Sequence, residues 1–177
     1  MKLYIGVKLK KNLALTGMMG VGKTSIGKIL SQKLSMKFID IDQIIERKLN
    51  ATISDIFKKK GEKFFRKYEE KITLNEVSKL NAVISLGGGA FINPKIRQQV
   101  QIYCTSFWLD LDVLLLKERL INSKKRPLLK NNDLKSVLEK IYKDRKKIYA
   151  LADFKIDCKK LNVESVANKI IELYESK

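Results

Sequence analysis

The sequence predicts an α/β protein: a three-layer α/β/α sandwich with a central parallel sheet. Short apolar segments of strand length alternate with longer segments in which apolar residues recur at helical spacing. A glycine-rich segment joins the first predicted strand to the first predicted helix. The chain has 177 residues, 45% of them hydrophobic, which is enough for one domain with a full core. We therefore expect residues 1–177 to form a single domain, with residues 1–11 as a possible N-terminal extension.

The glycine-rich segment is the strongest functional motif. It reads GMMGVGKT at residues 17–24, fits G-x-x-x-x-G-K-[ST], and lies between the strand candidate NLALT and the helix candidate SIGKILSQKL. Glycines let the backbone present N–H groups to a phosphate at a helix N-terminus, where the dipole favours anions. The motif predicts the P-loop NTPase fold and a nucleoside triphosphate; a glycine-rich turn without function is the alternative. The predicted nucleotide contacts here are Gly20, Val21, Gly22, Lys23, Thr24 and Ser25.

Two side chains of the loop and one further arginine are candidates for the phosphates. Lys23 can reach the β- and γ-phosphates, and Thr24 can offer its hydroxyl to Mg²⁺. Residues 122–132, NSKKRPLLKNN, are polar and basic, and they predict a mobile lid at about residues 120–132 that excludes water. Arg126 in this lid would bring its guanidinium to the phosphates. Lys23 and Arg126 are therefore candidate catalytic residues.

The strand candidate after the first helix carries two carboxylates. It reads FIDID at residues 38–42, and in a strand Asp40 and Asp42 would share one face at the strand's end. Asp40, nearer the phosphates, is suited to Mg²⁺, which keeps much of its water shell. Asp42 could bind substrate hydroxyls and take the proton of the attacking one. The alternative is that Asp42 only caps a helix over residues 42–49.

A second Asp-x-Asp pattern follows a later strand candidate. Further apolar strands are predicted at residues 83–86 and 102–109, and the second of these runs into the sequence WLDLD. Its carboxylates are Asp110 and Asp112, and the helical sequence VLLLKERL follows directly. We therefore expect Asp112 to be a helix N-cap. The last apolar pattern, VESVANKIIELYE, predicts a C-terminal amphipathic helix that serves the core.

Three glycines and two arginines are candidates for binding an anionic acceptor. Gly87, Gly88 and Gly89 follow the strand candidate VISL, where a backbone without side chains can approach a ligand closely; a tight turn is the alternative. Only six of the 37 basic residues are arginines, so an arginine suggests that a planar guanidinium is needed. Arg66 and Arg145 could bind a substrate carboxylate together. For Arg66, an ion pair with Glu69 or Glu70 is the competing interpretation.

The combination of these motifs resembles the shikimate kinase family. The matching segments are GMMGVGKTSIG, FIDIDQIIE, ISDIFKKKGEKFFRKYE, ISLGGGAF, KKRPLL and DRKKIYALAD, which cover roughly residues 12–155. The resemblance implies transfer of the γ-phosphate of ATP to the 3-hydroxyl of shikimate, giving shikimate 3-phosphate and ADP in chorismate and aromatic amino-acid synthesis. It implies Mg²⁺ at Asp40, the acceptor at Asp42, an Arg66–Arg145 clamp for the shikimate carboxylate, and Arg119 stacked on adenine.

The chain departs from the family's pattern at two places. Lys147 stands two residues after Arg145 where many members have proline, and Asn50 stands near a position where glycine is common. Other kinases remain alternatives: a gluconate-type sugar-acid kinase shares the phosphate loop and an anionic acceptor. A nucleoside monophosphate kinase fits less well, because the chain has no Asp-Gly-Phe-Pro-Arg sequence.

Composition narrows the possible partners and location. The formal net charge is +18, but the basic runs are not part of a recognisable nucleic-acid-reading module. We therefore expect no nucleic-acid partner. The alternative from another functional class is a regulatory or nucleic-acid-binding protein without kinase activity. No apolar run has the length of a membrane span, no secretory signal is recognisable, and the two cysteines have no histidine beside them for a zinc site. We expect a cytoplasmic monomer.

Overall fold

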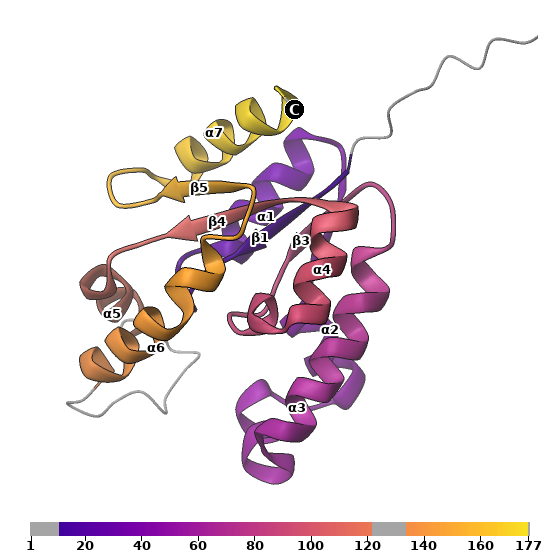
Figure 1. Cartoon of the computed structure of the whole chain (residues 1–177), viewed down its shortest axis with the longest axis vertical. Helices are drawn as coiled ribbons and strands as arrows, with labels where there is room; N and C mark the ends of the chain where they lie inside the picture. Colours follow the sequence, from indigo (N-terminus) through magenta and orange to yellow (C-terminus); the bar gives the residue numbers. More distant parts are fainter. Residues whose placement is uncertain (1–10, 122–133, 177) are drawn as a thin grey trace, which may run out of the picture.

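The computed structural model describes residues 11–121 and 134–176, and within them a five-stranded parallel sheet forms the centre (Figure 1). The strand order is β2-β3-β1-β4-β5, and every neighbouring pair is parallel. Because the strands are parallel, their carboxyl ends meet at one edge, where ligands bind in open α/β sheets. The strands are β1 (Asn12–Thr16), β2 (Lys37–Asp40), β3 (Ala82–Ser85), β4 (Cys104–Asp110) and β5 (Phe154–Asp157).

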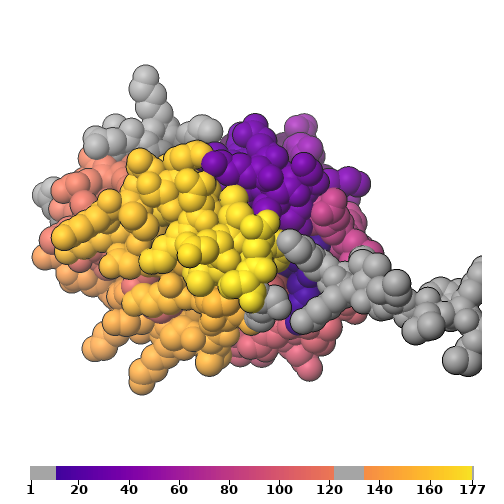
Figure 2. Space-filling model, turned by 90° about the horizontal axis from the view of Figure 1, so that it is seen from above, coloured from indigo at the N-terminus to yellow at the C-terminus, as the bar shows by residue number. Residues whose placement is uncertain are grey.

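Helices cover both faces of the sheet, which confirms the predicted three-layer architecture (Figure 1). Helices α1 (Lys23–Lys33) and α7 (Val163–Glu175) lie side by side on one face, as Figure 2 also shows, and an ion pair of 2.5 Å joins Lys33 to Glu164. Helix α4 (Pro94–Tyr103) packs against β4 on the other face. The other helices of the described residues are α2 (Ile41–Leu49), α3 (Ile53–Val77), the 3-10 turn η1 (Ala90–Ile92), α5 (Val113–Ile121) and α6 (Leu134–Tyr149).

The core lies along the three central strands. Every residue of β1 and β3 is buried, as expected for strands that are covered on both faces. Branched and aromatic side chains from the strands and from the inner faces of the helices fill this core. In the part of the chain that the structure describes, no helix is long and apolar enough to cross a bilayer.

The strand predicted at FIDID ends earlier than expected, and one strand of the sheet was not predicted. Strand β2 ends at Asp40 rather than continuing to Asp42, because Asp40 caps α2 by accepting a hydrogen bond from the Gln43 N–H at 3.2 Å. Asp42 therefore lies in the first turn of a helix and does not share a strand face with Asp40. Strand β5 was not predicted, because only Ile156 of its four residues is fully buried and its sequence alternates with polar residues.

The arm formed by α2 and α3 is shaped by two backbone positions. Asn50 ends α2 in the left-handed conformation (φ 45°, ψ 44°), which explains why a glycine would also suit this position. Helix α3 is interrupted at Gly61, whose φ of 76° and ψ of 168° lie outside the helical region. Beyond this kink the helix runs back toward the sheet (Figure 1), and Arg66 belongs to this part of α3.

Candidate active site

The phosphate loop lies between β1 and α1, as predicted. Gly17, Gly20 and Gly22 all have positive φ, and Gly22 is the left-handed residue directly before α1. A side chain at Gly17 would clash with the Leu109 carbonyl oxygen, so the loop starts close against β4. Gly22 makes no side-chain cap for α1. The first turn of α1 presents its backbone N–H groups at this loop, where the helix dipole favours an anion.

Lys23 folds back over the loop that precedes it. Its ammonium donates hydrogen bonds of 2.9 Å to the carbonyl oxygens of Gly17 and Met18. These contacts hold the charge at the loop, where it can exchange carbonyl oxygens for phosphate oxygens. Ser25 follows in the same first turn of α1 and is exposed.

Thr24 and Asp40 meet across the start of α1 and the end of β2. The Thr24 hydroxyl donates to Oδ2 of Asp40 at 2.8 Å, and Asp40 is 8% exposed. Both residues offer oxygen ligands, which suit a hard cation such as Mg²⁺. Within residues 11–121 and 134–176 no three Cys, Asp or Glu side chains are grouped for a metal. Two protein oxygens fit an ion that retains waters and also binds phosphates.

Asp42 and Glu69 both lie close to Gly87. A Cβ atom at Gly87 would clash with Oε1 of Glu69 and would lie 2.9 Å from Oδ1 of Asp42. The glycine therefore allows two carboxylates, from α2 and α3, to approach the turn after β3. The structure brings Asp42 to the carboxyl edge as predicted, although from a helix rather than from a strand.

Arg66 is held by two carboxylates of its own helix. Its Nη1 lies 2.8 Å from Oε2 of Glu69, and its Nε lies 3.2 Å from Oε1 of Glu62. The Arg66–Glu69 ion pair that was considered as an alternative is thus present. It does not remove Arg66 from the site, because a Cβ atom at Gly89 would lie 2.6 Å from Nη1 of Arg66.

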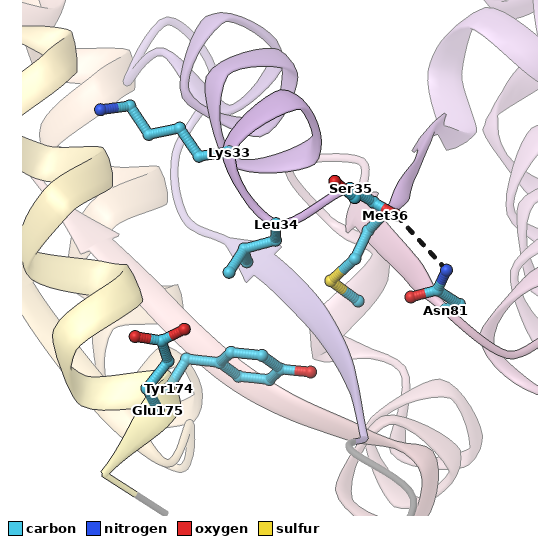
Figure 3. A pocket seen from close by; sticks show the side chains of 7 residues that line it. All are labelled: Lys33, Leu34, Ser35, Met36, Asn81, Tyr174 and Glu175. Carbon is cyan, nitrogen blue, oxygen red and sulfur yellow. Dashed lines mark hydrogen bonds between the residues drawn. The ribbon is translucent and has the colours of Figure 1, made fainter.

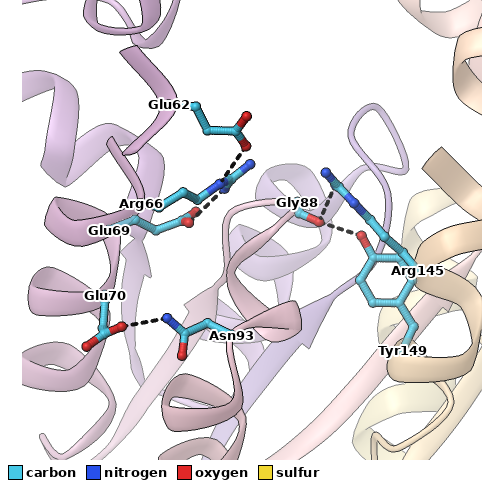
Figure 4. Close-up of polar contacts among 8 residues, drawn as sticks. All are labelled: Glu62, Arg66, Glu69, Glu70, Gly88, Asn93, Arg145 and Tyr149. Carbon is cyan, nitrogen blue, oxygen red and sulfur yellow. Dashed lines mark hydrogen bonds and ion pairs between the residues drawn. The ribbon is translucent and has the colours of Figure 1, made fainter. Parts of the chain in front are cut away.

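Arg145 approaches the same glycine turn from α6. Its Nη1 donates to the Gly88 carbonyl oxygen at 2.9 Å, and the Tyr149 hydroxyl donates to the same oxygen. Burial raises the pKa of Tyr149, so its hydroxyl stays protonated and can donate. Figure 4 shows Arg66 and Arg145 pointing toward Gly88 from opposite sides. The structure therefore places both predicted clamp residues around the predicted glycines.

The turn that the two arginines contact is also adjacent to the phosphate loop. A Cβ atom at Gly88 would lie 3.4 Å from the Met19 backbone nitrogen and 3.9 Å from Nη1 of Arg145. The predicted nucleotide-binding loop and the two guanidinium groups thus meet at one glycine turn. Consistent with this geometry, the family model for shikimate kinase matches residues 19–175. The chain belongs to the shikimate kinase family.

Individual relatives support the assignment over nearly the whole chain. A shikimate kinase from Bacillus pumilus is 41% identical over 92% of this chain and 89% of its own length. A solved shikimate kinase from Acinetobacter baumannii, in complex with shikimate, has a TM-score of 0.89 and 34% identity over 96% of this chain and 94% of that one. Deoxyadenosine kinase from M. mycoides, with 16% identity and a TM-score of 0.59 over 93% of this chain and 98% of that one, shares the fold alone.

Two arginines, Arg119 and Arg126, were predicted to contact the nucleotide, and the structure describes only Arg119. Arg119 of α5 donates from Nη1 to the Val21 carbonyl oxygen at 3.2 Å, so it lies beside the phosphate loop of this shikimate kinase family member. Arg126 and residues 122–132 lie outside the described residues. Of the predicted lid, only Leu120 and Ile121 are described, and they belong to α5.

The two carboxylates of the second Asp-x-Asp pattern make structural contacts, as a helix cap and as an ion-pair partner. Asp112 caps α5 by accepting from the Leu114 N–H at 2.8 Å, which confirms the N-cap prediction. Asp110 accepts a hydrogen bond of 2.9 Å from Tyr142 and lies 2.9 Å from the Lys155 ammonium. Burial, and then the hydrogen bond to Asp110, raise the pKa of Tyr142 to about 12.

The sequence indicated Glu69 only as a possible ion-pair partner of Arg66. The structure shows a carboxylate that is 2% exposed and whose Oε1 has no hydrogen-bond partner among the described residues. Burial raises its pKa, the Asp42 carboxylate raises it further, and Arg66 opposes both effects. Its position three residues after Arg66, on the buried face of α3, was the available signal. Tyr149 was not predicted as a site residue.

Two hollows in the described structure lie outside this site. One, of about 330 Å³, lies between α5 and α6. The other, of about 230 Å³, lies at the amino-terminal edge of the sheet (Figure 3) and is lined by Lys33, Leu34, Ser35, Met36, Asn81, Tyr174 and Glu175. Neither contains a residue assigned to the phosphates or to the acceptor.

Proposed function

We propose that this protein is a shikimate kinase that transfers the γ-phosphate of ATP to the 3-hydroxyl of shikimate, giving shikimate 3-phosphate and ADP. The reaction belongs to chorismate and aromatic amino-acid synthesis. The observation that carries the proposal is the pair of guanidinium groups, Arg66 and Arg145, on either side of a glycine turn that adjoins the phosphate loop. Two planar cations suit a carboxylate-bearing acceptor.

On the donor side, the chain provides positive charge and N–H groups for the triphosphate. Lys23 exchanges its contacts with Gly17 and Met18 for phosphate oxygens, and the first turn of α1 donates backbone N–H groups. Arg119, already at the phosphate loop, covers the adenine, and Arg126 adds a guanidinium to the phosphates. Thr24 and Asp40 would hold Mg²⁺, which would supply positive charge to neutralise the phosphates.

On the acceptor side, the clamp fixes the carboxylate and leaves the hydroxyl groups near Asp42. Arg66 and Arg145 bind the carboxylate, and the backbone of Gly87, Gly88 and Gly89 lines the turn between them. Asp42 binds the reacting hydroxyl and takes its proton as the phosphoryl group is transferred. Exclusion of water by residues 120–132 limits ATP hydrolysis. We further propose a cytoplasmic monomer that does not use nucleic acid as a partner.

A coupled ADP-release assay with three acceptors tests this function. We expect MgATP-dependent turnover with shikimate and only background rates with gluconate or AMP. Turnover with gluconate that exceeds that with shikimate would favour a sugar-acid kinase. Absence of turnover with all three acceptors would contradict a kinase that acts on a small hydroxy acid. Replacing Mg²⁺ by EDTA should abolish activity, since the Thr24–Asp40 pair needs the cation to engage the phosphates.

A further inference from the structure

A hydrogen bond outside the clamp joins α3 to the segment after the glycine turn. The Asn93 side-chain amide donates from Nδ2 to Oε2 of Glu70 at 2.6 Å (Figure 4). The amide oxygen of Asn93 caps α4, because it accepts from the Lys95 N–H at 2.9 Å and the Ile96 N–H at 3.4 Å. The Lys95 ammonium lies 3.4 Å from Oε1 of Glu70. The hydrogen bond from Asn93 lowers the pKa of Glu70, so the carboxylate form is favoured.

This hydrogen bond closes a ring of contacts around the acceptor site. Glu70 follows Arg66 by about one helical turn on α3. The turn η1 connects Gly89 to Asn93 through hydrogen bonds from the Ile92 N–H to the Gly89 carbonyl at 3.1 Å and from the Asn93 N–H to the Ala90 carbonyl at 3.1 Å. Gly89 in turn lies directly against the Arg66 guanidinium. The spacing between Arg66 and the glycine turn is therefore fixed at two points.

The turn inside this ring is itself held by an arginine. Arg97 donates from Nη1 to the carbonyl oxygens of Phe91 at 3.0 Å and Ile92 at 3.1 Å. Because η1 is bound in this way and Asn93 caps the next helix, a displacement of Asn93 cannot be absorbed by the turn alone. It would move Gly89 relative to Arg66.

We propose that Asn93 and Glu70 are positioning residues for the acceptor, which hold the glycine turn at the distance from Arg66 that the substrate carboxylate requires. The proposal rests on the proposed function. Under this proposal the Asn93–Glu70 pair affects acceptor binding separately from stability. ATP binding should not change, because neither side chain is needed for it.

The amide of Asn93 allows the two roles of its side chain to be separated. Asn93→Asp keeps the capping oxygen but places an acceptor against the Glu70 carboxylate. We expect the KM for shikimate to rise about tenfold and the KM for ATP to stay within about twofold. Glu70→Gln still accepts from Asn93, so its KM should change by less than about twofold. In the variant that carries both substitutions, the amide at position 70 donates to the carboxylate at position 93, so the hydrogen bond forms again in the reverse direction. Its KM for shikimate should return to within about threefold of the wild type.

The chain offers a matched control on the same helix. Asn75 donates from Nδ2 to Glu76 at 3.1 Å, with the Lys79 ammonium beside that carboxylate, more than two helical turns beyond Arg66. Asn75→Asp makes the same chemical change away from the site, and it should lower Tm by a similar amount without raising the KM for shikimate. If Asn93→Asp does not fold, Asn93→Ser keeps a capping oxygen, lacks the amide, and should raise the same KM.

The outcomes separate the two proposals. An active wild type whose Asn93→Asp variant keeps the wild-type KM for shikimate would overturn the positioning role alone. The same holds if the double variant recovers Tm but not KM, or if Asn75→Asp raises KM as much. A wild-type protein that does not phosphorylate shikimate would overturn the proposed function, and the positioning role with it, before any variant is measured.

Discussion

The proposed donor and acceptor halves of the site are constructed in different ways. On the donor side, Lys23 contacts backbone atoms of Gly17 and Met18, which are six and five residues away in the sequence. On the acceptor side, Arg145 contacts Gly88 across 57 residues, and Arg66 reaches the same turn from α3. A local loop creates the first half, whereas packing between α2, α3, α6 and the glycine turn creates the second.

This difference predicts how each half fails when it is altered. The donor half depends on backbone N–H groups and one ammonium, so a side-chain substitution there should lower the catalytic activity and leave the fold intact. The acceptor half depends on close contacts between charged side chains and glycines. A substitution there should change the geometry of acceptor binding and, in some cases, stability as well.

The largest effect is expected from Lys23→Ala on the donor side. Loss of a positioned cation at the transferred phosphoryl group should lower kcat/KM for ATP by about a thousandfold. The unfolding midpoint in urea should remain close to that of the wild type, because the Lys23 hydrogen bonds described above go to loop carbonyls. Lys28→Ala, on the exposed face of the same helix, is the control and should be fully active. An active Lys23→Ala variant would contradict the assignment of the loop.

The next largest effect is expected from Asp42→Asn. If Asp42 accepts the proton, kcat should fall by about a hundredfold, and the KM for ATP should change little. Asp112→Asn provides a comparison within the same Asp-x-Asp pattern. Asparagine caps a helix as well as aspartate does, so this variant should keep its activity. Equal losses in both variants would mean that Asp42, too, acts only through structure.

The two halves also differ in how far the sequence predicts them. The eight residues GMMGVGKT contain the donor loop almost completely, because its contacts are local and its glycines are required by the backbone. The position of Asp42 was predicted for the wrong element, because Asp40 ends β2 by capping α2 and a cap depends on one hydrogen bond. Strand β5 was missed because it is a four-residue edge strand, defined by pairing with β4 rather than by its own pattern.

The acceptor half could be predicted only as a set of separate residues. Arginine scarcity and the triple glycine indicated Arg66, Arg145 and Gly87–Gly89, but no pattern in the sequence indicates that a guanidinium packs on Gly89. The burial of Glu69 follows from the packing of α3 beside that turn, which is a tertiary feature. Distances in the structure are needed to assign a role to such residues, whereas the order of residues in the sequence is enough to assign one to Lys23.

Alanine substitutions in the glycine turn should have a moderate effect on acceptor binding, and the effect should differ between Gly89 and Gly88. In Gly89→Ala, the new Cβ would lie 2.6 Å from the Arg66 guanidinium, so Arg66 must move and the KM for shikimate should rise about tenfold. In Gly88→Ala, the nearest atom would be the Met19 nitrogen at 3.4 Å, an ordinary contact, and KM should change by less than about twofold. Steady-state kinetics with shikimate and with ATP measure both. A larger effect at Gly88 would indicate that the glycines leave room for the substrate itself rather than for Arg66.

The smallest effect distinguishes two neighbouring carboxylates through the pH dependence of stability. Burial raises the pKa of Glu69 above its ordinary 4.5, whereas the hydrogen bond from Asn93 lowers the pKa of Glu70 below the same value. Between 4.5 and its raised pKa, the folded state binds more protons at Glu69 than the unfolded state does, so its contribution to stability is lost as pH rises. At Glu70 the contribution is present above 4.5 and is lost as pH falls.

Urea unfolding at a series of pH values on both sides of 4.5 measures these two contributions. The unfolding free energy of the wild type minus that of Glu69→Gln should decrease as pH rises. The same difference for Glu70→Gln should increase. Parallel slopes for the two variants would show that Glu69 is solvated like its neighbour, and the acceptor half would then lack the buried carboxylate that holds Arg66 against the glycine turn.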